Sequence, residues 1–190
     1  MMKPAHAIFL QAQIDQQKHD LRAHRDILNL DTHTRIKHMT LHFLKYAGRL
    51  AEAQESQDLN ILNRSLLDTF IICLATANTL NLNLGKSCPL HAESLSKLAE
   101  SLHRQNSTSA DIYNEALFSV VKISGKMAKA IESTDHLEKG DPRSSLEALV
   151  ADLGLETLRL VGKANISIEN DLMDRWKKVE EKSIFYGSPI

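Results

Sequence analysis

Apolar residues recur at every third or fourth position along most of the chain, which is the period of one face of an α-helix. In the segment 32–56, Ile36, Met39 and Phe43 fall on one such face. The segment 59–82 is apolar nearly all round in its middle, which is typical of a central helix. No segment shows the alternation of a half-buried strand. The pattern predicts an all-α helical bundle of about seven helices, at 4–28, 32–56, 59–82, 89–104, 111–133, 143–165 and 167–182.

Residues with known positional preferences mark where several of these helices begin. Pro89 is expected to open the fourth helix, because proline is favoured at the first helical position. The spacing of Ser144 and Glu147 indicates a capping box at the start of the sixth helix, and Ser167 is expected to cap the seventh. The polar stretch 106–109 is the most linker-like part of the sequence.

Composition agrees with this pattern. The chain has 190 residues, of which 43% are hydrophobic and 25% charged, as in ordinary globular proteins. It contains only 7 Gly and 4 Pro, too few for the frequent turns of an all-β sandwich. We therefore expect residues 1–190 to form a single helical domain.

Charge and hydropathy narrow the expected partners and location. The net charge is −1, so no overall positive field favours nucleic acid. The longest apolar run, 70–75, is far shorter than a membrane span, and the N-terminal run 7–10 is too short for a secretory signal. The two cysteines, Cys73 and Cys88, do not form a disulfide framework. We expect a cytoplasmic protein that binds neither nucleic acid nor membrane.

The second and third predicted helices recur later in the chain. Residues 44–56 align with 121–133 at an offset of 77, with six identities in thirteen positions, where average composition gives about one. After a longer second loop the offset is 84, which places Asp68 opposite Asp152. We expect two repeats, about 32–105 and 111–182, to pack as a pseudo-twofold pair, either as a monomer with an internal pseudo-dimer or as a homodimer.

The repeated unit resembles the MazG-like superfamily of all-α nucleoside triphosphate pyrophosphohydrolases. The resemblance is carried in the first copy by 47–53 and by Asp68 with the run 77–80. In the second copy it is carried by 125–130 and Asp152, followed by the tail 166–182. It implies a four-helix core that, with Mg²⁺, hydrolyses nucleotides to a monophosphate and pyrophosphate.

The chain departs from this family at the metal-binding carboxylates. Family members carry E-E-x-x-E on the first helix and E-x-x-D on the second, because Mg²⁺ requires several hard oxygen ligands. Only the aspartates of the second motif remain, since Ser65 and Leu149 stand in place of its glutamates. The positions of the first motif are occupied by Lys45, Tyr46 and Arg49 in one copy and by Lys122, Ile123 and Lys126 in the other. We therefore expect no resident metal or other cofactor.

Cationic residues at these positions suggest that the inherited cleft now binds an anion directly, since Lys and Arg are the usual protein partners of phosphate. The expected function is a catalytically degenerate family member that binds a nucleotide or another phosphate-containing small molecule, or acts as a regulator. Its candidate binding residues are His42, Lys45, Arg49, Asp68, Lys122, Lys126 and Asp152. The same residues also fit a solvated helix face, with the aspartates in local salt bridges.

Two other functions remain open. The chain can be an active pyrophosphohydrolase that uses Asp68, Asp152 and other carboxylates, with Mg²⁺, in a rearranged site. It can also be a structural or partner-binding helical bundle. The spacing of His38 and His42 fits a helical metal pair, but no third ligand lies nearby in the sequence.

Overall fold

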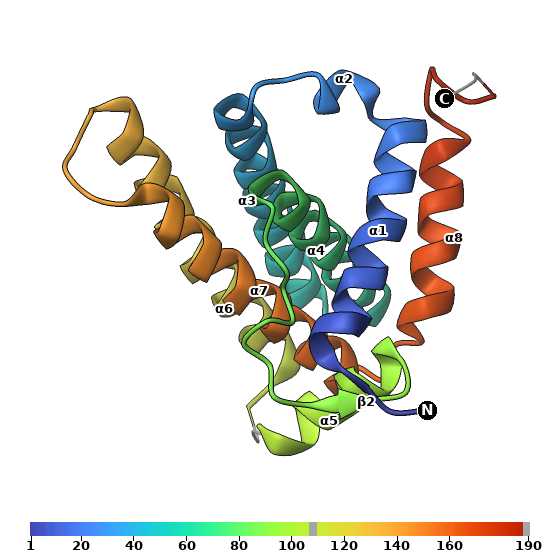
Figure 1. The fold of residues 1–190 in the computed structure, drawn as a ribbon. Helices are drawn as coiled ribbons and strands as arrows, with labels where there is room; N and C mark the ends of the chain where they lie inside the picture. The colour runs from blue at the N-terminus through green and yellow to red at the C-terminus, as the bar shows by residue number, and fades with distance from the viewer. Residues whose placement is uncertain (107–109, 188–190) are drawn as a thin grey trace.

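The computed structural model describes residues 1–106 and 110–187, and it confirms the all-α prediction (Figure 1). Within those residues the chain forms eight helices and one short antiparallel pair of strands. The helices are α1 (Ala5–Ala23), α2 (Arg25–Leu28), α3 (Thr32–Ser56), α4 (Leu59–Leu80), α5 (Leu95–Gln105), α6 (Ile112–Asp135), α7 (Pro142–Lys163) and α8 (Ile168–Glu180). The strands are β1 (Lys3–Pro4) and β2 (His91–Ala92).

Four long helices, α3, α4, α6 and α7, form the centre of the bundle. Helix α3 packs on α4 and α6, and α7 packs on α4 and α6. Helices α3 and α6 run antiparallel, since His33 at the start of α3 contacts Asp135 at the end of α6, and the Tyr113 hydroxyl donates to the carbonyl of Gln57. The helices of the two sequence repeats therefore pack on each other within one chain. The pseudo-twofold symmetry itself remains a prediction.

The outer helices cover this centre in a similar order. Helix α1 packs on α4, and α5 packs on α7 (Figure 1). One covering helix thus precedes each long pair along the chain, α1 before α3 and α4, and α5 before α6 and α7. The core that they enclose is continuous, and its largest fully buried side chains include Phe9, Phe43, Phe70, Leu50, Met127 and Leu153.

Helix α4 has the length and apolar composition of a membrane-spanning helix. Most of it is buried inside the bundle, and 13 of its 22 residues are buried. Its position among α3, α7, α1 and α8 accounts for an apolar surface on nearly every side.

The N-terminal segment is not the single helix 4–28 that its sequence pattern predicts. Helix α1 ends at Ala23, and His24 leaves the helical region with φ −136° and ψ 40° before the single turn of α2. The hydroxyl of Ser183, from the far end of the chain, donates to the free carbonyl of Ala23 at 2.9 Å. A contact across 160 residues therefore supports the break, which explains why local periodicity did not reveal it.

The fourth predicted helix begins later than expected. Pro89 lies in an extended segment, and α5 starts only after Ser94, whose side chain caps the helix by accepting from the amide of Lys97. The carbonyl of Leu90 accepts a hydrogen bond from the amide of Ala5, next to the pairing of β1 with β2. Pairing with the N-terminus thus keeps this segment extended.

The beginning of α7 also differs from the prediction. Asp141, not Ser144, is the N-cap, and its carboxylate accepts from the amide of Ser144 at 3.0 Å. Glu147 does not reach back to complete a capping box; it pairs with Arg143 at 2.8 Å. Ser167 is the N-cap residue of α8, but its side chain makes no capping hydrogen bond. Most of the predicted linker, 107–109, lies outside the described residues.

Candidate functional site

The carboxylate of Asp68 is the centre of the first candidate site. It lies on α4 with 3% of its side chain exposed. Arg175 of α8 donates to both of its oxygens, from Nε at 2.6 Å and from Nη2 at 3.1 Å. Arg49 of α3 approaches the same carboxylate at 3.7 Å. The hydrogen bonds that Arg175 donates to Asp68 favour the charged form of Arg175 and raise the pKa of its guanidinium.

A line of polar side chains continues along α3 from this ion pair. Lys45 Nζ lies 3.1 Å from Nδ1 of His42, and Nε2 of His42 lies 3.1 Å from Nε2 of His38. Lys45 also lies over the ring of Tyr46, 4.5 Å from its centre. Burial, followed by the charge of Lys45, lowers the pKa of His42 to about 4. His42 is therefore neutral near pH 7, and its Nδ1 can accept a hydrogen bond from Lys45.

A groove of about 540 Å³ opens beside this cluster, between α4 and α8. Arg175 lies on its wall and so connects the groove with Asp68. The other basic residues on the wall are Arg64, Lys178 and Lys182, and the acidic residues are Asp171, Asp174 and Glu181. The groove therefore carries both signs of charge, and Arg175 is the lining residue that contacts Asp68.

The remaining predicted residues do not join this cluster. Lys122 and Lys126 are exposed on α6, and Asp152 is exposed on α7. None of the three has an ion pair or side-chain hydrogen bond within the described residues. The structure thus brings together His42, Lys45, Arg49 and Asp68 from the first repeat alone.

The second repeat has a different polar cluster near Asp152. Arg159 of α7 donates to Glu115 of α6 and to Glu156, both at 2.7 Å. Lys163 reaches Glu115 at 2.6 Å. These pairs join α6 to α7 with matched charges, which is the arrangement of a structural salt-bridge network.

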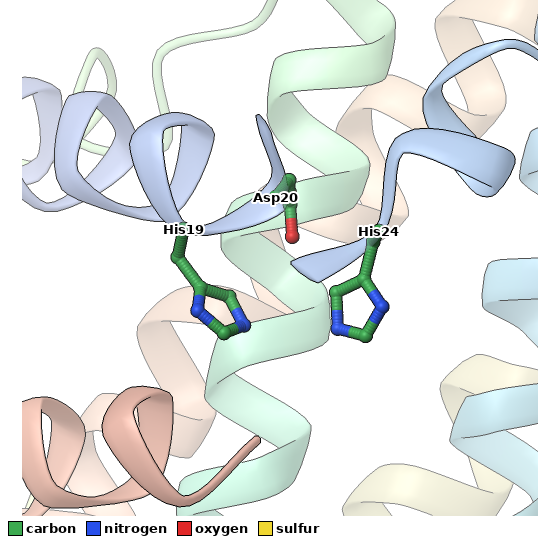
Figure 2. A group of neighbouring side chains, drawn as sticks. All are labelled: His19, Asp20 and His24. Atoms are coloured by element: carbon green, nitrogen blue, oxygen red, sulfur yellow. The ribbon is translucent and has the colours of Figure 1, made fainter. Parts of the chain in front are cut away.

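A second candidate site, which the sequence analysis missed, lies at the end of α1. Atoms of His19, Asp20 and His24 that could ligate a metal all lie within 4.8 Å of one another. Figure 2 shows the Asp20 carboxylate between the two imidazole rings in this view. Burial raises the pKa of Asp20 to about 7, against the opposing effect of a hydrogen bond from Gln16.

Contacts from α8 hold the first of these histidines in place. Nδ1 of His19 lies 3.0 Å from the carboxylate of Glu180, and its ring stacks on Trp176 with centroids 6.0 Å apart. The indole N–H of Trp176 donates to Gln16 at 2.8 Å. Helix α8 therefore supports both candidate sites, through Arg175 in one and through Glu180 and Trp176 in the other.

The residues that sequence reasoning missed share a physical cause. Arg175 and Glu180 lie more than 100 residues from the side chains that they contact, and no local pattern pairs them. His19, Asp20 and His24 are close in sequence, but a continuous helix would turn residues five apart by about 140°. The only sequence feature that could have indicated this site is the adjacent pair His19-Asp20 followed by His24. That spacing brings the three side chains together only because the helix breaks at His24.

Comparisons with known proteins identify no relative: no family model, no curated protein and no solved structure matches this chain.

Proposed function

We propose that this chain binds a nucleotide or another phosphate-bearing small molecule at the cationic cluster beside Asp68, and that it does so without Mg²⁺. The observation that carries the proposal is the two-fold hydrogen bonding of Asp68 by Arg175. A carboxylate whose two oxygens both accept from a guanidinium is a poor ligand for a cation. The protein's own cations take the place of the metal.

The balance of charge around Asp68 supports an anionic ligand. Arg175 and Arg49 contact a single carboxylate, and the charge of the partly buried Lys45 also interacts with it. Partial burial and the neighbouring Arg49 lower the pKa of Lys45, as expected where positive charges gather. One carboxylate cannot accept hydrogen bonds from all three cations. The oxygens of a bound phosphate would accept those that Asp68 leaves unmade. Arginine is well suited to this task because its planar fork matches phosphate geometry.

The adjoining groove supports a ligand of small-molecule size. Its volume of about 540 Å³ lies within the range of roughly 300–1,000 Å³ common for such pockets. Asn60 and Asn63 on its wall offer amides that could bind a sugar or a base. The Oδ1 atom of Asn63 is buried and has no hydrogen-bond partner among the residues that the structure describes. The resemblance of the repeated helices to pyrophosphohydrolases supports the same ligand class.

Binding is tested by calorimetry with inorganic pyrophosphate and with a panel of ribo- and deoxyribonucleoside triphosphates in the presence of EDTA. Lys45→Ala and Arg49→Ala should each weaken binding about 10- to 100-fold, since a hydrogen bond to a charged group contributes about 1.5–3 kcal/mol. The matched controls are Lys122→Ala and Lys126→Ala, at the corresponding positions of the second repeat. They should bind as the wild type does. Absence of binding by the wild type would refute the proposal.

The double variant Lys45→Ala with Lys122→Ala separates one cationic site from a paired one. For a single site beside Asp68, the double variant binds like Lys45→Ala alone. An additional loss in the double variant would instead include Lys122 in the site, as the sequence repeat suggested.

Catalysis is tested by the release of pyrophosphate with Mg²⁺ present. We expect pyrophosphate release at the background rate. The metal-binding glutamates of the resembled family are replaced here by Lys45, Tyr46, Arg49 and Ser65. In addition, both oxygens of Asp68 accept hydrogen bonds from Arg175. Robust turnover that Asp68→Asn abolishes would favour the alternative of an active pyrophosphohydrolase.

One observation favours a second function, the binding of a partner or of another copy of the chain. Leu41 on α3 and Phe118 on α6 occupy corresponding repeat positions and are 65% and 66% exposed. Leu44 and Val121, which follow them by three residues on the same helices and also correspond, are each 45% exposed. Large apolar side chains left exposed on packed helices often belong to a protein interface. Sedimentation equilibrium distinguishes monomer from dimer, and Phe118→Glu should dissociate a dimer formed through this face.

A further inference from the structure

Two imidazoles and one carboxylate converge where α1 ends. His19 and Asp20 belong to the last turns of α1, and His24 is its C-cap residue. The rings of His19 and His24 are 5.4 Å apart between centroids and nearly perpendicular. Because the backbone leaves the helix at His24, its side chain returns to the face that carries His19, as Figure 2 shows. The helix break therefore creates the cluster.

The contact of His19 with Glu180 resembles the hydrogen bonds that hold ligating histidines in metal sites. Histidines that ligate metals usually donate their second ring N–H to a carboxylate, which orients the ring and raises the basicity of the ligating nitrogen. Nδ1 of His19 lies 3.0 Å from Glu180, so Nε2 is left to face the cluster. Trp176 stacks on the same ring and further restricts its orientation.

The carboxylate of Asp20 and the ring of His24 still have atoms free to bind a metal ion. Asp20 accepts one hydrogen bond, from Gln16 at 2.8 Å, on Oδ1. The ring nitrogens of His24 have no hydrogen-bond partner among the described residues. Asp20 and His24 both line a cavity of about 90 Å³, which His38 and His42 of α3 also line. An ion held by three protein ligands would thus have space for a fourth ligand, such as water.

Two arginines lie near the cluster. Arg22 approaches the outer carboxylate of Glu180 at 3.4 Å. Arg35, which also lines the cavity, donates to the carbonyls of Leu28 and Leu30. The guanidinium of Arg35 is thereby held by backbone oxygens and makes no hydrogen bond to Asp20. The carboxylate keeps Oδ2 for a cation.

From this geometry we infer that His19, Asp20 and His24 bind one divalent transition-metal ion of the Zn²⁺ type, with Glu180 positioning His19. Two imidazoles and one carboxylate are a donor set suited to such an ion and less suited to Mg²⁺ or Ca²⁺, which prefer oxygen ligands alone. Ligands of a tetrahedral ion with bonds of about 2.0–2.1 Å lie roughly 3.3 Å apart, so closure from within 4.8 Å needs side-chain shifts on the order of 1 Å. This site is separate from the cationic cluster beside Asp68.

The test uses the untagged full-length chain, freed of metal by a chelator and then titrated with Zn²⁺ by calorimetry and with Co²⁺ by visible absorption. We expect one ion per chain, a rise in melting temperature and the visible bands of Co²⁺ in a low-symmetry site. Asp20→Asn and His24→Gln should each weaken Zn²⁺ binding by more than a hundredfold. Glu180→Gln should weaken it about 10- to 100-fold, as outer-shell substitutions do.

Matched controls separate this site from other histidines. His91→Ala removes an exposed histidine on β2 and should leave binding unchanged. His38→Ala removes another histidine that lines the cavity and should retain the ion. Circular dichroism without metal establishes that each variant is folded. The inference is overturned if the wild type binds no ion, or if His38→Ala abolishes binding while Asp20→Asn keeps it.

Discussion

At the scale of single residues, the buried ion pair of Asp68 with Arg175 shows how a tertiary contact decides what a carboxylate can do. The resemblance to pyrophosphohydrolases would make Asp68 a metal ligand, but a guanidinium from α8 donates to both of its oxygens. The ion pair with Arg175 therefore decides what Asp68 can bind. Arg175 belongs to α8 and lies 107 positions further along the chain.

Removing one partner of this pair should be costly. Arg175→Ala leaves Asp68 buried with only the longer contact to Arg49, and we expect the free energy of unfolding to fall by about 3 kcal/mol. Urea denaturation measures the change. Replacing both partners, as Asp68→Leu with Arg175→Met, should recover most of the loss, because no uncompensated charge remains buried. A loss below about 1 kcal/mol for Arg175→Ala would instead indicate that water satisfies Asp68.

His42 should make the stability of the fold depend on acidity. The pKa of His42 is lowered to about 4 in the folded chain, against an ordinary value of 6.5 for histidine. Between these two values the unfolded chain binds a proton that folded His42 does not, so stability is lost as the pH falls from 6.5 towards 4. His42→Gln should reduce that loss by roughly 1–3 kcal/mol. Urea denaturation at pH 7 and pH 4.5, with EDTA present, measures it.

Asp20 should give the opposite dependence of stability on pH and so serves as a comparison for His42. The raised pKa of Asp20, about 7, means that its folded form holds a proton while the unfolded chain has released it, so its ionisation destabilises the fold as the pH rises towards 7. Asp20→Asn should therefore stabilise the metal-free chain at pH 8 and have little effect at pH 4. Equal effects at both values would contradict the assignment.

At the scale of helices, local rules placed the long central helices and α8 well, and they misplaced the end of α1 and the start of α5. The predicted segment 32–56 coincides with α3, and the start predicted for the third helix coincides with that of α4. Both begin after an aspartate that caps them with its side chain. Periodicity alone did not predict the end of α1 at His24, because a contact with the distant Ser183 supports that break.

The N-terminus of α7 offers a direct test of capping. Asp141→Ala should lower the free energy of unfolding by about 1 kcal/mol, because the side chain satisfies the amide of Ser144. Ser167→Ala, at a cap position without a side-chain capping bond, should change it by only a few tenths. If Ser144→Ala cost more than Asp141→Ala, the capping box predicted from sequence would be correct after all.

At the scale of the whole molecule, the two repeats share one core. Helix α3 packs on α6, and α4 packs on α7, so both long helices of each repeat bury surface against the other repeat. Each half alone would expose these apolar faces to water. We therefore regard the pair as one cooperative unit.

Cleavage between the repeats tests this unity. With a protease site inserted between Asn106 and Ala110, the two fragments should remain together on size-exclusion chromatography after cleavage. Either fragment produced alone should be insoluble, or helical only after it is mixed with the other, as circular dichroism reports. Two fragments that each fold as stable monomers would show two independent domains.

The sequence by itself determined the helical class and the long central helices, and its self-similarity predicts two related units. These depend on periodicity, capping and self-similarity, which act over a few residues or can be found by alignment. Only the tertiary structure decided which side chains meet. Arg175 reaches Asp68, Glu180 reaches His19, and Ser183 reaches Ala23, all through the packing of α8 and the segment after it. Such contacts arise from where remote helices pack, and no local pattern encodes them.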